Sequence, residues 1–189
     1  MLRTLKQTST VALGAAALLA ALPYSAAVAD TFGFGATPTA EEIAMVDIDA
    51  MPDGRGLPAG SGTATAGETV YAEQCAACHG ENLEGVKETG GAALIGGRGT
   101  IGTPETKKTV ESYWPYATTL FDYVKRAMPF DAPGSMSDDD IYAVSAYILH
   151  RGDIIEADAV MDASTLAAVE MPNKDGFIAD PRPDLHTYR

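Results

Sequence analysis

Five consecutive residues, Cys75-Ala76-Ala77-Cys78-His79, constrain this chain more than any other feature of its sequence. Two cysteines three positions apart, followed at once by histidine, form the pattern through which a haem is attached covalently. Both thiols can then bond to vinyl groups on one side of the porphyrin, and His79 lies beneath the iron as its proximal ligand. Zinc binding or thiol exchange would need a second ligand pair or a thioredoxin-like βαβ pattern, and neither is visible. The motif predicts one covalent haem c held by Cys75, Cys78 and His79.

The first 29 residues have the features of a secretory signal peptide. Arg3 and Lys6 supply a short basic region, residues 11–22 an apolar run, and Ala27-Val28-Ala29 a small-x-small cleavage pattern. The apolar run is shorter than the ~20 residues that span a bilayer, although an uncleaved N-terminal anchor is the alternative reading. We expect cleavage before Asp30, a periplasmic location and no stable membrane insertion.

The charge of the chain is strongly acidic. Its formal net charge is -13, and removal of residues 1–29 takes away two positive charges and no negative ones. Such a balance argues against nucleic acid and anionic membrane surfaces as partners. It is compatible either with simple solubility or with steering towards a partner that has a basic face.

Turn-rich stretches divide the remaining sequence into three parts. Residues 30–64 form an N-terminal extension rich in Gly and Pro, residues 65–152 the main domain, and residues 153–189 a C-terminal extension. Helices are predicted over residues 39–46, 66–76, 119–127, 137–152 and 164–169. Thr65 and Glu68 match a capping box at the start of the second helix, and Ser137 is the predicted N-cap of the fourth. No segment alternates convincingly as a strand, so the predicted fold class is all-α, with both extensions wrapped on the surface.

The second axial ligand of the iron is predicted to be a methionine. Met128 follows the third helix and precedes Pro129, which stiffens the loop, whereas Met136 precedes an N-cap, where an apolar residue more often packs against the helix start. His150 lies in the last turn of a helix, where a cation complements the helix dipole, and His186 is near the C-terminus. We therefore favour Met128 and leave Met136 as the alternative. A thioether ligand raises the reduction potential.

Two further side chains are candidates for contact with the haem. Trp114 belongs to a group of aromatic residues around the proposed ligand loop, together with Tyr116, Phe121 and Phe130. Because the haem forms the core of such a small domain, packing in the core and packing on the haem are the same role here. Arg98, between two glycines, could pair with a haem propionate or simply be solvated.

The order of these features over residues 65–152 resembles a class I cytochrome c. That resemblance implies an all-helical fold around one haem, in which the first and last helices cross closely. Gly67 and Tyr71 on the first helix, with Ala143 and Tyr147 on the last, match the residues of that crossing. The chain departs from the family at residues 91–94, where many relatives have a proline whose carbonyl accepts from the proximal histidine.

A narrower resemblance covers nearly the whole chain after residue 29. Five stretches look like the cytochrome subunits of sulfur-oxidising molybdenum enzymes, the SoxD type of sulfane dehydrogenase and the SorB-like type of sulfite dehydrogenase: residues 38–43, 53–58, 112–119, 126–130 and 171–177. The resemblance implies a molybdenum-containing dehydrogenase subunit as electron donor and a downstream cytochrome or oxidase as acceptor. A freely diffusing electron carrier and, with less support, a haem enzyme or gas sensor are the alternatives.

Overall fold

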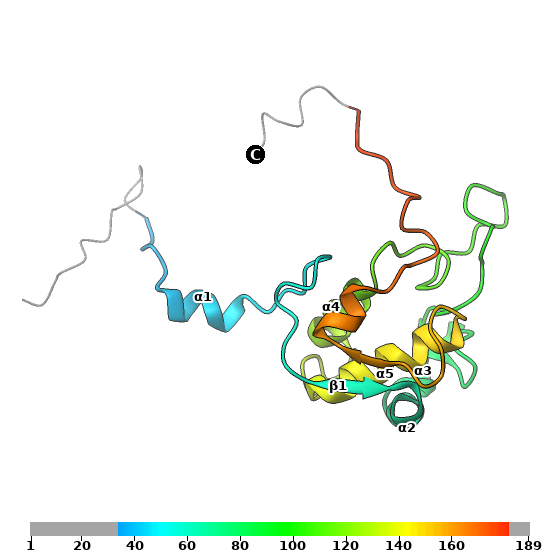
Figure 1. The fold of residues 1–189 in the computed structure, drawn as a ribbon, viewed down its shortest axis with the longest axis horizontal. Coiled ribbons are helices and arrows are strands. Elements are labelled where there is room, and N and C mark those ends of the chain that lie inside the picture. The colour runs from blue at the N-terminus through cyan, green and yellow to red at the C-terminus, as the bar shows by residue number, and fades with distance from the viewer. Residues whose placement is uncertain (1–33, 182–189) are drawn as a thin grey trace, which may run out of the picture. The chain divides into compact units, whose positions relative to one another are not determined.

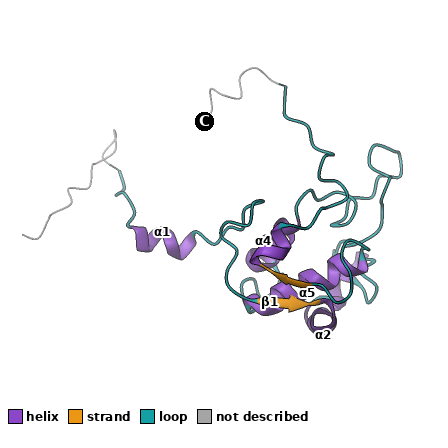
Figure 2. Cartoon of the chain, viewed as in Figure 1, coloured by secondary structure: helices purple, strands orange, loops and turns teal. Residues whose placement is uncertain are grey.

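The computed structural model describes residues 34–181, so the predicted signal peptide, Phe32 and His186 lie outside the described residues. The chain divides after Ala40, and the residues from Glu41 onward form one compact unit. The elements, in chain order, are α1 (Ala40–Val46), β1 (Ser61–Thr63), α2 (Ala64–Gln74), α3 (Ala76–His79), the 3-10 turn Lys87–Thr89, α4 (Ala117–Ala127), α5 (Asp138–Arg151), β2 (Val160–Asp162) and α6 (Ala163–Ala167) (Figures 1 and 2). Among the described residues, no helix is long and apolar enough to cross a membrane.

The predicted start of α2 is wrong by two residues. Thr63, not Thr65, is the N-cap, and its side chain accepts a hydrogen bond from the amide of Ala66 at 3.3 Å. Pairing of β1 with β2 holds Thr63 in the extended conformation that an N-cap requires. The capping box expected between Thr65 and Glu68 is therefore absent, because Thr65 already lies inside the helix.

The helices predicted around α4 and α5 are confirmed. Ser137 caps α5 by accepting from the amide of Asp140, and Gly152 follows its last residue. The burial of this helix is not limited to one face, because every residue from Ile141 to Leu149 is buried. Helix α5 packs against α2, against α4 and against both strands, so it is covered on several sides.

The structure contains a two-stranded sheet that the sequence did not predict. Strands β1 and β2 pair antiparallel, with Gly62 opposite Met161. Three residues are too few for an alternating pattern to be recognised. The sheet joins the N-terminal extension to the C-terminal one across α5, where a Cβ on Gly62 would lie 2.2 Å from the amide nitrogen of Ala143.

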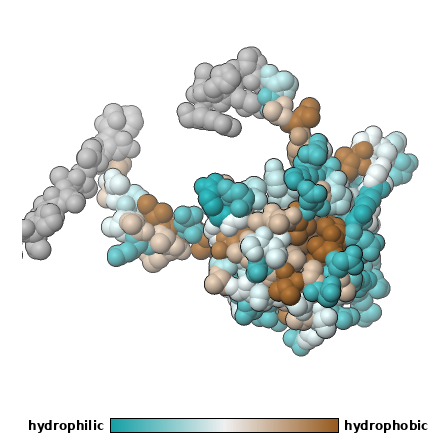
Figure 3. Space-filling view, in the orientation of Figure 1, coloured by the Kyte–Doolittle hydropathy of each residue, from teal (hydrophilic) through white to brown (hydrophobic). Residues whose placement is uncertain are grey.

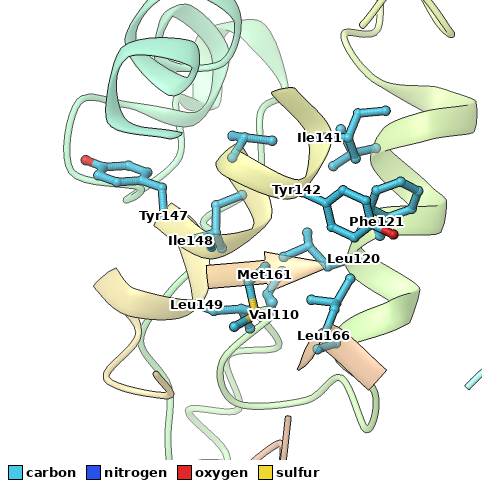
Figure 4. Packing of buried hydrophobic residues seen from close by; sticks show 14 of the residues in the cluster. Val110, Leu120, Phe121, Ile141, Tyr142, Tyr147, Ile148, Leu149, Met161 and Leu166 are labelled. Atoms are coloured by element: carbon cyan, nitrogen blue, oxygen red, sulfur yellow. The ribbon is translucent and has the colours of Figure 1, made fainter. Parts of the chain in front are cut away.

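The predicted crossing of the first and last helices is confirmed. A Cβ atom on Gly67 would lie 1.9 Å from the carbonyl oxygen of Ala143, so only glycine permits this approach. Beside it, the rings of Tyr71 and Tyr147 are 5.2 Å apart. On the other side of α5, Phe121 and Tyr142 face each other at 4.5 Å (Figure 4). Helix α5 is thus fixed by aromatic contacts to both α2 and α4.

The two extensions contribute to the same hydrophobic core. Met161, Leu166 and Met171 are fully part of it, and Leu57, Ile155 and Val169 are partly buried against it. Phe34 and Ile43 do not pack in this core, since their side chains are 83% and 47% exposed. Phe177 is half exposed but lies edge-on to Tyr113 at 5.2 Å.

The crossing at Gly67 gives a direct test of this packing. We expect Gly67→Val to lower the free energy of unfolding by about 3 kcal/mol or more, because no space exists for its side chain. Truncation of the neighbouring ring in Tyr147→Ala should cost about 3–5 kcal/mol. Thermal melts of the holoprotein measure both effects, with Ala66→Val at an exposed position of α2 as control. Equal melting temperatures for Gly67→Val and the control would contradict the crossing.

Candidate haem-binding site

The two cysteines lie at a break between two helices. Cys75 ends α2, with its amide donating to Tyr71, and the four residues of α3 place Cys78 and His79 one turn further on. Both thiols are free of any disulfide; Cys75 is partly buried against the hydrophobic core and Cys78 is exposed. Burial, with a smaller contribution from the nearby Cys78, raises the pKa of the Cys75 thiol to about 11. The Cys75 thiol therefore lies against the core, whereas the Cys78 thiol is exposed.

The ring of His79 is oriented by a backbone carbonyl. Its Nδ1 lies 2.7 Å from the carbonyl oxygen of Ala92. Because a carbonyl can only accept, Nδ1 carries the proton, and Nε2 is the nitrogen left for a metal. The ring of His79 therefore donates to a backbone carbonyl, and Ala92 is the acceptor. A carbonyl carries no signature in the sequence, so the motif alone could not identify Ala92.

The loop that carries Ala92 packs directly on the cysteine motif. The amides of Gly85 and Val86 donate to the carbonyls of His79 and Cys78, at 2.7 and 3.1 Å. A Cβ on Gly91 would lie 1.8 Å from the Cys78 carbonyl oxygen, so glycine is required next to Ala92. These contacts hold the loop close enough for the Ala92 carbonyl to accept a hydrogen bond from the His79 ring.

Arg98 makes contacts that the sequence did not predict. Its Nε lies 2.7 Å from a carboxylate oxygen of Glu111, and its terminal nitrogen donates to the carbonyls of Gly152 and Asp153. The second oxygen of Glu111 accepts from the amide of Gly96. Arg98 and Glu111 thereby hold residues 96–98 against the end of α5. Contact of Arg98 with a haem propionate stays a prediction. No periodicity or motif linked Arg98 to Glu111.

Met128 and Trp114 both lie at the edge of the core. Met128 is the C-cap of α4, with its amide donating to Val124, and its peptide bond to Pro129 is cis. Trp114 lies edge-on to Tyr123 at 5.8 Å. Both side chains are partly buried against the same hydrophobic core as Cys75. In contrast, Phe130 is 85% exposed and does not pack among the protein side chains, so its contact with the haem stays a prediction.

The competing candidate Met136 is, like Met128, partly buried against the hydrophobic core. Met136 lines a hollow together with Val70, Gln74 and Asp140, between α2 and α5. His150 is partly buried, and its Nδ1 lies 3.2 Å from the carbonyl oxygen of Ile155. The choice of Met128 over Met136 and His150 as the sixth ligand stays a prediction.

The residues present fit a covalent haem c. Two unpaired thiols precede a histidine whose Nδ1 donates to a carbonyl and whose Nε2 is left for iron. When bound, a haem c supplies reversible exchange of one electron. Cys75, Cys78 and His79 would hold it, and Met128 is proposed as a further ligand of its iron.

Replacement of the two methionines separates the ligand candidates. We expect Met128→Ala to give a high-spin or water-ligated spectrum and a lower reduction potential, because water stabilises oxidised iron better than a thioether does. Met136→Ala should leave the spectrum nearly unchanged and serves as the matched control. Visible absorption and potentiometric titration measure both properties. A reversed result, with the spectrum changed only in Met136→Ala, would show that Met136 is the ligand.

Comparison with known proteins agrees with this geometry. The family model described as cytochrome c matches residues 64–152. The crystal structure of the sulfane dehydrogenase SoxCD from Paracoccus pantotrophus is similar with a TM-score of 0.72 and 39% identity, over 82% of this chain and 74% of that chain. This finding confirms the resemblance to the cytochrome of a sulfane dehydrogenase.

A thiosulfate dehydrogenase of Stutzerimonas stutzeri (strain A1501) is also similar, with 29% identity over 113 residues. The match includes 59% of this chain and 33% of the relative, so the chain spans about a third of that protein's length. Together with the site geometry, these similarities show that the chain belongs to the class I cytochrome c family and carries a covalently bound haem c.

Proposed function

We propose that this electron-transfer cytochrome is the periplasmic, mono-haem subunit that accepts single electrons from a molybdenum-containing sulfite or sulfane dehydrogenase. It then passes them to a downstream cytochrome or oxidase. The observation that carries the proposal is the extent of the similarity to SoxCD. The haem domain, residues 64–152, is 89 of the 189 residues, whereas the similarity covers 82% of the chain. The match must therefore include residues of the extensions.

The packing of the extensions supports a dedicated subunit over a freely diffusing carrier. Electron transfer requires only an exposed haem edge and a small, weak interface. Ordering a residue costs about 1–2 kcal/mol of backbone entropy, so long extensions remain ordered only where contacts offset that cost. Here β1 pairs with β2, and Leu166, Met161 and Met171 are buried in the core. Such additions fit a protein whose surface serves a specific complex.

The surroundings of the proposed ligand Met128 support electron transfer over catalysis at the haem. The ionisable groups at this end of α4 are already paired: Arg126 with Asp122, and Lys125 with Asp138 at 2.6 Å. Such pairs are poorly placed to act as acid or base towards a substrate. The similarity to a thiosulfate dehydrogenase nevertheless favours, as second candidate, a haem enzyme that oxidises thiosulfate itself.

Reduction kinetics test the two candidates against each other. We expect the oxidised, full-length cytochrome to be reduced by sulfite or a sulfane donor only when the molybdenum-containing subunit of the same organism is present. Stopped-flow absorbance at the haem bands measures the rate of reduction. In a second experiment, thiosulfate is mixed with the cytochrome in the absence of the molybdenum-containing subunit. Rapid reduction by thiosulfate without the molybdenum subunit would support the haem enzyme and contradict the electron-transfer role.

A further inference from the structure

We propose that residues 41–48, which comprise most of α1 and the two residues after it, dock into an apolar groove with a basic rim on the molybdenum-containing subunit. This inference rests on the proposed function and assigns to α1 the attachment to that partner. We call residues 41–48 the docking segment.

The docking segment has an apolar surface that is exposed among the residues that the structure describes. Ile43, Met45, Val46 and Ile48 are 47%, 73%, 75% and 40% exposed, and no residue of α1 is buried (Figure 3). A helix of seven residues is too short to be stable in water by itself, because isolated helices need about 12 residues or more. Burial of these side chains against another protein would supply the missing stabilisation, as when a short helix lies in a groove.

The segment that follows behaves differently. The amide of Ala50 donates to Asp122 at 2.9 Å, the hydroxyl of Tyr142 donates to the carbonyl of Pro58, and Leu57 is partly buried. Residues 50–58 are therefore anchored on the haem domain, whereas the apolar side chains of the docking segment are exposed. Within the N-terminal extension, some apolar side chains therefore pack on the haem domain, and others are exposed and available to a partner.

Charge determines which kind of partner fits. Glu41, Glu42, Asp47 and Asp49 lie within nine residues, and no Lys or Arg occurs between residues 30 and 54. An anionic membrane or a second copy of this chain, whose net charge is -13, would repel such a segment. A groove with Lys and Arg at its rim would attract it and speed association. The observations thus favour a different protein with a basic rim.

The anchor points place the partner close to the proposed haem ligand. Asp49, next to the docking segment, lies 3.4 Å from the guanidinium of Arg126, two residues before Met128. Ala50 is only four positions after Val46, so the two residues are at most roughly 14 Å apart. A protein bound to the docking segment would therefore lie beside the end of α4 that carries Met128. This position suits electron transfer into the haem.

The test uses the full-length holocytochrome and the purified molybdenum-containing subunit of the same organism. We expect Ile43→Ser/Val46→Ser to raise the dissociation constant about tenfold or more, because these truncations remove two anchors of the interface. Ile178→Ser, which replaces an apolar side chain that is 90% exposed outside the segment, is the matched control and should bind as wild type. The visible spectrum, the reduction potential and the melting temperature should be unchanged in both variants.

A second pair of variants tests the charge. Glu41→Gln/Asp47→Asn should slow association several-fold and weaken its dependence on salt, because rim charges act mainly on the association rate. The control, Glu105→Gln/Asp175→Asn, removes the same charge from exposed positions elsewhere. Equal association rates and salt dependence for the two pairs would contradict the basic rim.

The outcomes separate this inference from the proposed function. If the wild type binds the molybdenum subunit and Ile43→Ser/Val46→Ser binds equally well, the docking segment is wrong and the proposed function stands. If the wild type does not bind that subunit, both fail. Self-association of the isolated cytochrome, or binding to phosphatidylglycerol vesicles, that is lost in Ile43→Ser/Val46→Ser would assign the segment to another occupant and overturn the inference.

Discussion

The close contact between α2 and α5 at Gly67 is the constraint on which the rest of the structure depends. It brings the backbone of α2 against Ala143 and leaves no room for a side chain at position 67. Helix α2 ends at Cys75, so the position of the cysteine motif follows from the position of this helix. Helix α5 is then the central element, because α4 and both strands pack on its remaining sides.

The haem site combines features that differ in how readily a sequence reveals them. Cys75, Cys78 and His79 were predictable because covalent attachment requires those residue types at that spacing. The acceptor for His79, the carbonyl of Ala92, was not predictable, because any residue can supply a carbonyl and its position depends on the folded loop. The pairing of Arg98 with Glu111 could not be predicted either, because the two residues are 13 positions apart in the sequence and follow no periodic pattern.

The same distinction applies to the fold. Ser137 and the acidic turn after it predicted the start of α5 correctly, because capping depends on neighbouring residues. The start of α2 was placed two residues late, since the choice between Thr63 and Thr65 depends on the pairing of β1 with a strand almost one hundred residues away. The exposure of Ile43 could not be predicted, because an apolar side chain looks the same in the sequence whether it faces the core or a partner.

The central claim is that this cytochrome functions in a stable complex with a molybdenum enzyme. Measurement of iron and molybdenum across the size-exclusion profile of the protein purified from its own organism tests this claim most directly. The account predicts that both metals elute together, in a constant ratio, at a mass above that of one chain of 19.7 kDa. Iron eluting without molybdenum at the mass of a single chain would contradict it.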